Sequence, residues 1–385
     1  MTHGNMIEKT VSRVLEKFGS LPYPFRVHTL DGETIPVGEG EPVFDIHIRN
    51  ERGLSALTSL NKLLIVEAYI QGHLDFEGDL VKASALSIML EDNNWWIRIW
   101  RHLQPLLMGR EKLNPQWIAK HYDSGNIQLF AADQDYNTYT PGIYTHDGDT
   151  LEAGAERKLE FAFNNLELKT NDRLLEIGCG WGGMMRYCAR RGVIVTGITL
   201  SKNQKAYCEK LIEENQLIAE VHYQDFFTYR PEEKYDALSI MGVIEDLSDY
   251  PRVMKQIATF IKPGGKVYLD FASATALGGT SSFITKYVWP GKFRLVDMTQ
   301  FIEAVRSSLF EIVAIHNDRY NYYYWSKGVY ERWREKKDEI LKVTNDQLWR
   351  TFDALFASVA AVMIRPQYDI TAYRVVLEFP KDRVF

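Results

Sequence analysis

From residue 150 to residue 271, apolar and amphipathic stretches alternate regularly, and this alternation constrains the fold more than any other feature. Apolar stretches of strand length lie at residues 173–177, 193–198, 220–223, 235–241 and 266–271. Helical periodicity predicts helices at residues 151–165, which Thr150 caps, and at 183–191, 201–215 and 249–261. Parallel strands that are joined by crossover helices form an open sheet. The sequence therefore predicts an α/β protein with a doubly wound, parallel, Rossmann-like sheet.

The rest of the chain adds a second domain. Further strands are predicted at 310–315 and 370–379, and helices at 298–308, 325–343 and 346–363. Before residue 94 the patterns predict a hairpin of strands 25–28 and 42–48, a helix at 54–69 and a short piece at 72–80. The length of 385 residues also exceeds what one core usually organises. We expect an α+β domain over 1–94, a helical connector over 95–119 and the larger domain over 120–385.

Composition excludes several classes of function. The net charge of −6 argues against nucleic acid as the main partner, because phosphate binding requires clustered Lys and Arg. The three cysteines, Cys179, Cys188 and Cys208, are too scattered for a disulfide framework or a metal site. The longest uncharged apolar run, residues 355–364, is too short to span a membrane, and no secretory signal is readable. We expect a cytoplasmic protein with no bound metal.

The strand at 173–177 runs into a glycine-rich loop, Gly178-Cys179-Gly180-Trp181-Gly182-Gly183. Glycines at this point let the backbone turn tightly and approach a ligand. The spacing also fits the dinucleotide fingerprint, but the acidic residue expected after the second strand is missing, since that strand ends in Thr199-Leu200-Ser201. Glu176, before the first glycine, suits a nucleoside that carries an amino group and a sulfonium. S-adenosylmethionine is therefore favoured over NAD, and over a tight turn that binds nothing.

Several motifs together resemble the cyclopropane-fatty-acid synthase and mycolic acid methyltransferase family. They are His121-Tyr122-Asp123, Tyr139-Thr140, the stretch 174–183, the stretch 197–204, Gly242-Val243-Ile244-Glu245 and the stretch 286–291. The resemblance covers most of the chain. It implies a class I methyltransferase fold, a lipid-binding-like N-terminal domain, a homodimer, and a hydrophobic small-molecule or lipid substrate with peripheral membrane contact.

The resemblance also assigns cofactor residues. It places the methionine and ribose parts of S-adenosylmethionine at Gly178, Gly180, Thr199, Leu200 and Gln204, the adenine at Asp225 and Phe226, and a cover at Tyr122, Tyr139 and Thr140. Simpler explanations stay open for some of them. Ser201 and Gln204 also form a capping box, the two tyrosines suit core positions, and Asp225 suits a turn after a strand.

The sequence departs from the family at the group that accepts a proton. Ring-forming members are thought to hold a bicarbonate with a Cys, a Glu, a His and a Tyr. Here the Cys position is Pro141, the His position is Asp270 and the Tyr position falls near Phe356, so only Glu245 remains. The histidine that usually follows this Glu is Asp246. Bicarbonate is therefore doubtful as a cofactor, and ring closure with it.

We therefore expect methyl transfer to an alkene carbon of an unsaturated acyl lipid or a prenyl or terpenoid substrate, ending in proton loss to Glu245. Asp246 or Asp270 would assist, and a helix-start role for Glu245 is the simpler alternative. Tyr322 and Tyr323, in the aromatic run 320–325, suit the wall of a site for a cation, although such runs also pack ordinary helices. Amine N-methylation, true cyclopropane synthesis and a non-enzymatic lipid-binding scaffold stay open as alternatives.

Overall fold

The computed structural model describes residues 3–92, 127–247, 249–274, 281–288, 295–364 and 370–382. These residues fall into two compact units. The N-terminal unit comprises the described residues of Met1–Gln104, Ser281–Pro290 and Tyr330–Val362. The Rossmann-like unit comprises those of Pro105–Thr280, Gly291–Val329 and Met363–Phe385. The predicted connector at 95–119 lies outside the described residues.

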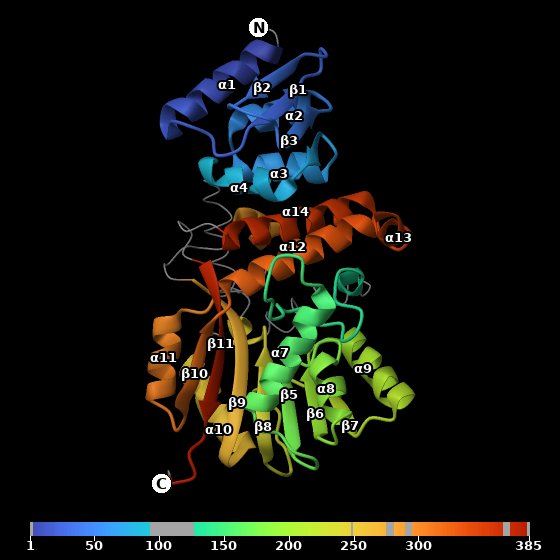
Figure 1. Cartoon of the computed structure of the whole chain (residues 1–385), viewed down its shortest axis with the longest axis vertical. Helices are drawn as coiled ribbons and strands as arrows, with labels where there is room; N and C mark the ends of the chain where they lie inside the picture. Colours follow the sequence, from blue (N-terminus) through green and yellow to red (C-terminus); the bar gives the residue numbers. More distant parts are fainter. Residues whose placement is uncertain are drawn as a thin grey trace. The chain divides into compact units, whose positions relative to one another are not determined.

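The Rossmann-like unit is built on a seven-stranded sheet with the order β10-β11-β9-β8-β5-β6-β7 (Figure 1). The strands are β5 (Arg173–Ile177), β6 (Ile194–Thr199), β7 (Ala219–Tyr223), β8 (Tyr235–Met241), β9 (Ile261–Ala274), β10 (Glu311–Asn317) and β11 (Ile370–Glu378). From β7 to β9 all neighbours pair in parallel, as predicted. The sheet is nevertheless mixed, because β11 pairs antiparallel with both β9 and β10. β11 begins beside the end of β10, where Asn317 pairs with Tyr373, so it runs back along β10.

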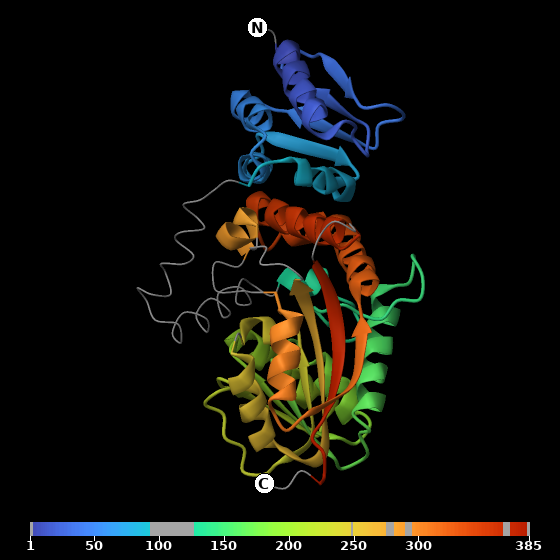
Figure 2. The same cartoon turned by 90° about the vertical axis from the view of Figure 1, so that its left-hand side faces the viewer.

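Helices cover both faces of this sheet, which confirms the doubly wound prediction (Figure 2). On one face α7 (Leu151–Asn165), α8 (Gly183–Ala189) and α9 (Lys202–Asn215) bury Leu159, Met185 and Cys208. On the other, α10 (Tyr250–Phe260) and α11 (Met298–Arg306) bury Val253, Ile257 and Phe301. The predicted N-cap is present, since the Thr150 hydroxyl accepts from the Ala153 N–H at 3.2 Å.

The N-terminal unit contains a four-stranded sheet with the order β2-β1-β3-β4. Its elements up to residue 89 are α1 (His3–Phe18), β1 (Phe25–His28), β2 (Thr34–Val37), β3 (Phe44–Ile48), α2 (Glu51–Ser59), α3 (Lys62–Ile70), β4 (Leu74–Gly78), α4 (Leu80–Leu86) and the 3₁₀ turn η1 (Ser87–Met89). The predicted hairpin partner was wrong: β1 forms its hairpin with β2, and β3 pairs with β1 in parallel.

The single helix predicted at 54–69 is also wrong, because the chain breaks it at residue 60. Leu60 adopts a left-handed backbone with φ 54°, which ends α2. The Asn61 side chain then accepts from the N–H groups of Leu63 and Leu64, which starts α3. The apolar pattern continues across the break, so periodicity alone did not reveal it.

Between β10 and β11 the chain forms α12 (Arg319–Glu335), α13 (Lys337–Leu341) and α14 (Asp346–Met363). The first helix begins at Arg319 rather than at the predicted residue 325, so the aromatic run 320–325 lies inside it. Residues 330–362 belong to the N-terminal unit, together with residues that precede them by more than 200 positions. Shorter turns are η2 (Ile127–Phe130), η3 (Ile244–Asp246) and the π-helical η4 (Ile284–Val288).

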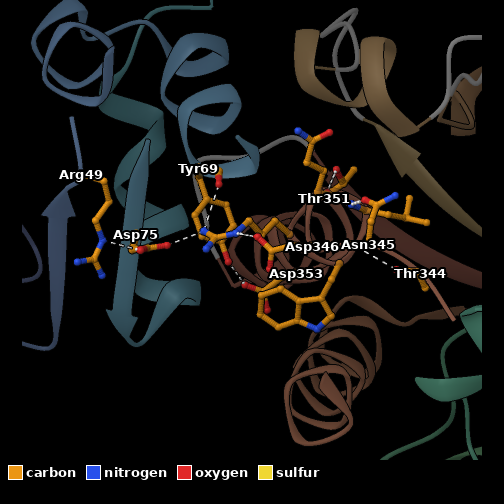
Figure 3. Close-up of polar contacts among 12 residues, drawn as sticks. Arg49, Tyr69, Asp75, Thr344, Asn345, Asp346, Thr351 and Asp353 are labelled. Atoms are coloured by element: carbon orange, nitrogen blue, oxygen red, sulfur yellow. Dashed lines mark hydrogen bonds and ion pairs between the residues drawn. The ribbon is translucent and has the colours of Figure 1, made fainter. Parts of the chain in front are cut away.

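Charged side chains tie α14 to the N-terminal sheet within this unit (Figure 3). Asp353 is fully buried and accepts from the Tyr69 hydroxyl at 2.6 Å and from two guanidinium nitrogens of Arg334 at 2.9 and 3.1 Å. One helical turn away, Arg350 donates to Asp75 at 2.6 Å, and Asp75 also accepts from Arg49 at 2.7 Å. In the part of the chain that the structure describes, no helix is long and apolar enough to cross a membrane.

Candidate functional site

A cavity of about 660 Å³ lies beyond the carboxyl ends of β5, β6 and β8. The strand order reverses between β5 and β8, and open α/β sheets bind their ligands at such a point. Most of the predicted cofactor residues line this one cavity: Tyr139, Thr140, Glu176, Gly178, Gly180, Thr199, Leu200, Gln204, Asp225 and Phe226. Asp246 lines it as well. Tyr122 lies outside the described residues.

The glycine loop has the backbone that its sequence predicts. Gly178 has φ 72°, and a Cβ there would lie 2.4 Å from Cγ2 of Val243, so packing and backbone both require glycine. Gly180 has φ 52°, but a Cβ there would meet nothing within 4 Å. Gly180 therefore leaves its share of the cavity wall open to a ligand, as expected of a cradle for a nucleoside.

Glu176, the last but one residue of β5, has a buried carboxyl group. Its Oε2 atom finds no hydrogen-bond partner among the described residues. Burial raises the pKa of Glu176 to about 8, although a backbone N–H from Met185 and the charge of Lys158 act in the opposite direction. An unsatisfied, buried carboxyl oxygen beside the cavity fits the amino group of a ligand.

The contacts of Thr199 and Gln204 show how much of the predicted Ser201–Gln204 capping box is present. Ser201 caps α9, since its hydroxyl accepts from the Gln204 N–H at 3.2 Å. The reciprocal contact of a capping box is not what the Gln204 side chain makes: its Oε1 accepts from the Thr199 hydroxyl at 2.7 Å. The Ser201 N–H donates to Thr199 instead, at 3.2 Å. Capping therefore explains Ser201 but not the Gln204 side chain, which reaches the cavity wall.

At the other end of the cavity, Asp225 does act as a turn residue, because its Oδ1 accepts from the Phe227 N–H at 2.8 Å. It lines the cavity as well. Phe227 and Arg252, which the sequence did not single out, complete this end, with the guanidinium 4.1 Å from the ring centre. No motif marked these two residues, since they come from a loop and a helix 25 positions apart.

The segment that carries Tyr139 and Thr140 is held by a buried acid, Asp133. Its Oδ2 accepts from the N–H and the hydroxyl of Thr138, both at 2.6 Å. The Tyr139 ring lies 5.8 Å from that of Trp325 in an edge-on arrangement. Tyr139 thus both lines the cavity and packs in an aromatic contact, and its role as a cover over the cofactor stays a prediction.

A second group of polar residues surrounds Glu245, which is buried in η3. Its Oε1 accepts from the Ala272 N–H of β9 at 2.9 Å, and its Oε2 has no hydrogen-bond partner in the described part of the chain. Burial raises the pKa of Glu245 to about 8, and the negative charges of Asp246 and Asp270 add to this. Burial and the charges of Glu245 and Asp270 raise the pKa of Tyr322 in turn. The charges of Glu245 and Asp270 therefore act on one another and on Tyr322.

Two other aromatic positions lie elsewhere. The Tyr323 ring is 5.5 Å from that of Tyr324 in α12, and Tyr323 is not among the residues that line the cavity. Phe356, where the family's tyrosine was expected, packs on Trp333 and Phe352 inside the N-terminal unit. Tyr322, by contrast, is close enough to Glu245 for the charge of that carboxyl to raise its pKa.

The sequence reasoning missed Lys158, a lysine with 1% of its surface exposed. It lies on the buried stripe of α7, which also contains Ala155, Leu159 and Ala162. Its ammonium donates to the Thr140 hydroxyl and lies 3.4 Å from Oδ2 of Asp270. A charged residue within an apolar stripe of helical period was a readable signal that it would need a buried partner.

Comparison with known proteins decides the family. A family model described as mycolic acid cyclopropane synthetase matches residues 110–372, more than half of the chain. The chain belongs to this family. A second family model, described as a domain of unknown function, matches residues 12–92. The predicted membership of the cyclopropane synthetase family is confirmed, and with it the class of enzyme, a SAM-dependent methyltransferase.

Several curated relatives of this cyclopropane synthetase family member have names that describe enzymes that modify lipids. A probable fatty acid methyltransferase of Mycobacterium tuberculosis is 26% identical and covers 88% of this chain and 88% of its own length. A sphingolipid C9-methyltransferase of Komagataella phaffii is 24% identical, with 81% of this chain and 68% of its own length covered. A cyclopropane-fatty-acyl-phospholipid synthase of Escherichia coli is 26% identical, with 65% of this chain and 67% of its own length covered.

Solved structures confirm the α/β methyltransferase fold. A cyclopropane synthase of Mycobacterium tuberculosis has a TM-score of 0.63 at 21% identity and covers 69% of this chain and 98% of its own. A coclaurine N-methyltransferase, solved with N-methylheliamine and S-adenosylhomocysteine, has a TM-score of 0.59 at 16% identity and covers 81% and 99%. S-adenosylmethionine is the cofactor, as predicted, and the open glycine cradle and the unsatisfied Glu176 oxygen fit it.

Proposed function

We propose that this enzyme methylates an alkene carbon of an unsaturated acyl lipid and that the reaction ends by proton loss to Glu245 rather than by ring closure. The coarser statement, that the chain is a SAM-dependent enzyme of a family that acts on lipids, rests on the comparisons above. One observation carries the finer one. Glu245 is a buried acid whose Oε2 has no hydrogen-bond partner among the described residues, the charges of Asp246 and Asp270 act on its pKa, and Asp246 lines the cofactor cavity.

S-adenosylmethionine supplies the methyl group. The alkene would use its π electrons to form the new C–C bond while the bond between sulfur and the methyl group breaks, so that S-adenosylhomocysteine leaves with that electron pair and the positive charge moves to the adjacent carbon. A carboxylate in a buried site stabilises such a charge and can accept a proton from the neighbouring C–H, whose electron pair restores a double bond. Glu245 is suited to this role because its pKa of about 8 makes it a stronger base than an exposed carboxylate.

The residues that replace the family's usual cage support the same outcome. Pro141 offers no thiol, and Asp270 brings a carboxyl where a histidine would donate a hydrogen bond to bicarbonate. Two acids beside one another repel a bound anion and attract a cation. Bicarbonate therefore has no place in the mechanism proposed here, and a protein carboxylate takes over the proton.

The test is the product formed from S-adenosylmethionine that carries a CD3 group, with vesicles of unsaturated phospholipid as the acceptor. Methylation with proton loss gives a product that keeps all three deuterium atoms and its double bond. Cyclopropane formation keeps two deuterium atoms and loses the double bond. A label on a nitrogen atom of the headgroup would instead support the amine methyltransferase alternative. A labelled prenyl compound would show that the substrate is a prenyl or terpenoid alkene rather than an acyl chain.

The base is tested separately. Glu245→Gln should lower turnover by roughly 10²- to 10⁴-fold while S-adenosylhomocysteine still binds, because the carboxylate acts after cofactor binding. Glu303→Gln, an exposed acid on α11, is the matched control and should leave turnover unchanged. Full turnover in Glu245→Gln would remove Glu245 as the base.

We propose a lipid-binding role for the N-terminal unit as well. It contains a cavity of about 160 Å³ with an almost entirely apolar wall. The wall includes Val11, Phe44, Leu57 and Phe76, and α14 adds Ala354. Such a cavity fits a hydrocarbon chain better than a polar ligand. Leu57→Trp, which would fill it, should weaken binding of a fluorescent fatty acid and leave S-adenosylhomocysteine affinity unchanged; equal fatty acid binding would contradict the role.

A further inference from the structure

The buried ammonium of Lys158 contacts both a residue that lines the cofactor cavity and an acid of β9. On one side it donates to the hydroxyl of Thr140, which lines the cavity. On the other side it lies 3.4 Å from Oδ2 of Asp270. Its charge also reaches Glu176, the unsatisfied acid of the cavity wall. One side chain of α7 thus contacts Thr140 of the cavity wall and Asp270 of β9.

Stability is a poor reason for this arrangement. Lys158 is 1% exposed and Asp270 is 7% exposed, and the cost of removing two charges from water commonly exceeds what their attraction returns. A pair of apolar residues of similar volume would hold α7 against β9 at least as well. The Lys158–Asp270 pair is therefore better explained by the groups that it orients than by packing.

Several charged and titratable groups surround Asp270 and shift the pKa values of the acids near it. Across the β9–β11 ladder Asp270 lies opposite Arg374, whose Nε donates to Asp318 at 2.5 Å. Tyr268 of β9 also lies within reach of the Asp270 charge. Asp246 of η3 and Asp270 act on the pKa of Glu245, Glu245 and Asp270 act on that of Tyr322 in α12, and Lys158 acts on that of Glu176 in β5.

We propose that Lys158 is a positioning residue that links the two halves of the site, because its ammonium holds both the Thr140 hydroxyl at the cofactor cavity and the Asp270 carboxyl group of β9. The part of this proposal that concerns Glu245 rests on the function proposed above. The part that concerns Thr140 and Glu176 rests on the cofactor cavity alone. Lys158 does not itself line the cavity. It acts on the cavity through Thr140 and on the Glu245 carboxyl through Asp270.

Removing the ammonium has opposite effects on the two acids. Lys158 lowers the pKa of Glu176, so its loss moves the Glu176 pKa further upward. Burial raises the pKa of Asp270 and the charge of Lys158 opposes this shift, while a charged Asp270 raises the pKa of Glu245. Without Lys158, Asp270 takes up a proton more readily, and the Glu245 pKa moves downward. A purely structural lysine would not shift the two profiles in opposite directions.

The experiment compares Lys158→Met, Asp270→Asn, the double variant and Thr140→Val in the full chain. S-adenosylhomocysteine affinity is measured by calorimetry across pH, and methyl transfer is measured across the same range. In Lys158→Met the affinity should fall about tenfold near neutral pH, as for loss of one charge-assisted hydrogen bond, and its acidic limb should move to higher pH. The acidic limb of turnover should move to lower pH.

The remaining variants separate the two links. Thr140→Val should weaken affinity in the same direction as Lys158→Met and leave the turnover limb in place. Asp270→Asn should move the turnover limb alone, and adding Lys158→Met to it should shift that limb no further. Lys262→Met, which breaks the partly exposed pair of Lys262 with Asp236, is the matched control and should change neither profile.

Two results would overturn the proposal. One is an unchanged affinity profile in both Lys158→Met and Thr140→Val; the other is a pair of limbs that shift in the same direction. If Lys158→Met does not fold, Lys158→Met with Asp270→Leu removes both charges together and keeps the pair neutral, and the affinity arm is read there. Should wild-type enzyme methylate something other than an alkene, the function proposed for Glu245 fails while the affinity arm still decides the role of Lys158.

Discussion

The hydroxyl of Tyr69 donates a 2.6 Å hydrogen bond to Asp353, which lies 284 positions later in the chain and is fully buried. Two nitrogens of Arg334 complete the shell of the carboxylate. Removing Asp353 leaves the partly buried guanidinium of Arg334 and the buried phenol of Tyr69 without this acceptor. Asp353→Ala should therefore lower the free energy of unfolding of the N-terminal unit by about 3–5 kcal/mol, and Tyr69→Phe by about 1 kcal/mol. Urea denaturation followed by tryptophan fluorescence would measure both, and equal effects would contradict this ranking.

The two glycines of the cofactor loop should fail in different ways. Gly178→Ala forces a Cβ to 2.4 Å from Val243 at φ 72°, so it should lower the melting temperature as well as the affinity for S-adenosylhomocysteine. Gly180→Ala meets nothing within 4 Å, and should cost only the backbone strain of about 1–2 kcal/mol while still weakening the ligand. Differential scanning fluorimetry with and without ligand separates the two. A larger loss of stability in Gly180→Ala would contradict the packing argument.

Capping and binding can be separated on α9. Ser201→Ala removes the cap and should cost about 1 kcal/mol of stability. Gln204→Leu keeps the cap, because the Gln204 contribution to it is a backbone N–H, but it removes the side chain that accepts from Thr199. Its main effect should be weaker S-adenosylhomocysteine binding in calorimetry. Undiminished affinity in Gln204→Leu would leave its side chain a purely structural role.

Stability should fall as the pH rises from about 5 to about 8. Burial raises the pKa of both Glu176 and Glu245 from an ordinary value of 4.5 to about 8, so the folded state binds more protons than the unfolded state in this window. Their contribution is complete below pH 4.5 and is lost as the pH passes 8. Glu176→Gln and Glu245→Gln should each flatten the profile, by an amount on the order of a few kcal/mol between the two ends. Urea midpoints at pH 6 and pH 9 would show this, and parallel profiles for wild type and variants would contradict it.

Local patterns predicted the Rossmann-like unit well because its signals are local. The strand at 173–177, the glycine loop and the Thr150 cap each depend on residues within a few positions of one another. The antiparallel β11 was missed because strand direction depends on where the chain returns after α12–α14. The break at Leu60 was missed for a different reason: a left-handed leucine has no distinctive sequence pattern.

The residues that line the large cavity were predictable from sequence, whereas the meeting of Lys158 with its partners was not. Motif residues such as Thr199 and Gln204 reach the cavity from a single strand–helix turn, and spacing fixes such contacts. Lys158, Asp270 and Tyr322 come from three elements whose meeting depends on the tertiary fold. The family's tyrosine was placed at Phe356 because register along a helical insertion of uncertain start could not be followed from sequence.

The membership of residues 330–362 in the N-terminal unit has a consequence for synthesis on the ribosome. The first 92 residues emerge early, and a separate family model covers most of them. α14 nevertheless supplies part of the wall of their apolar cavity, and it supplies the buried acid Asp353 that accepts from Tyr69. More than 250 residues must be translated before Ala354 and Asp353 arrive. Nascent N-terminal segments therefore expose an unfinished apolar wall throughout most of translation, a condition in which chaperones bind. The boundary that sequence families draw at residue 92 is thus not a boundary at which folding can finish.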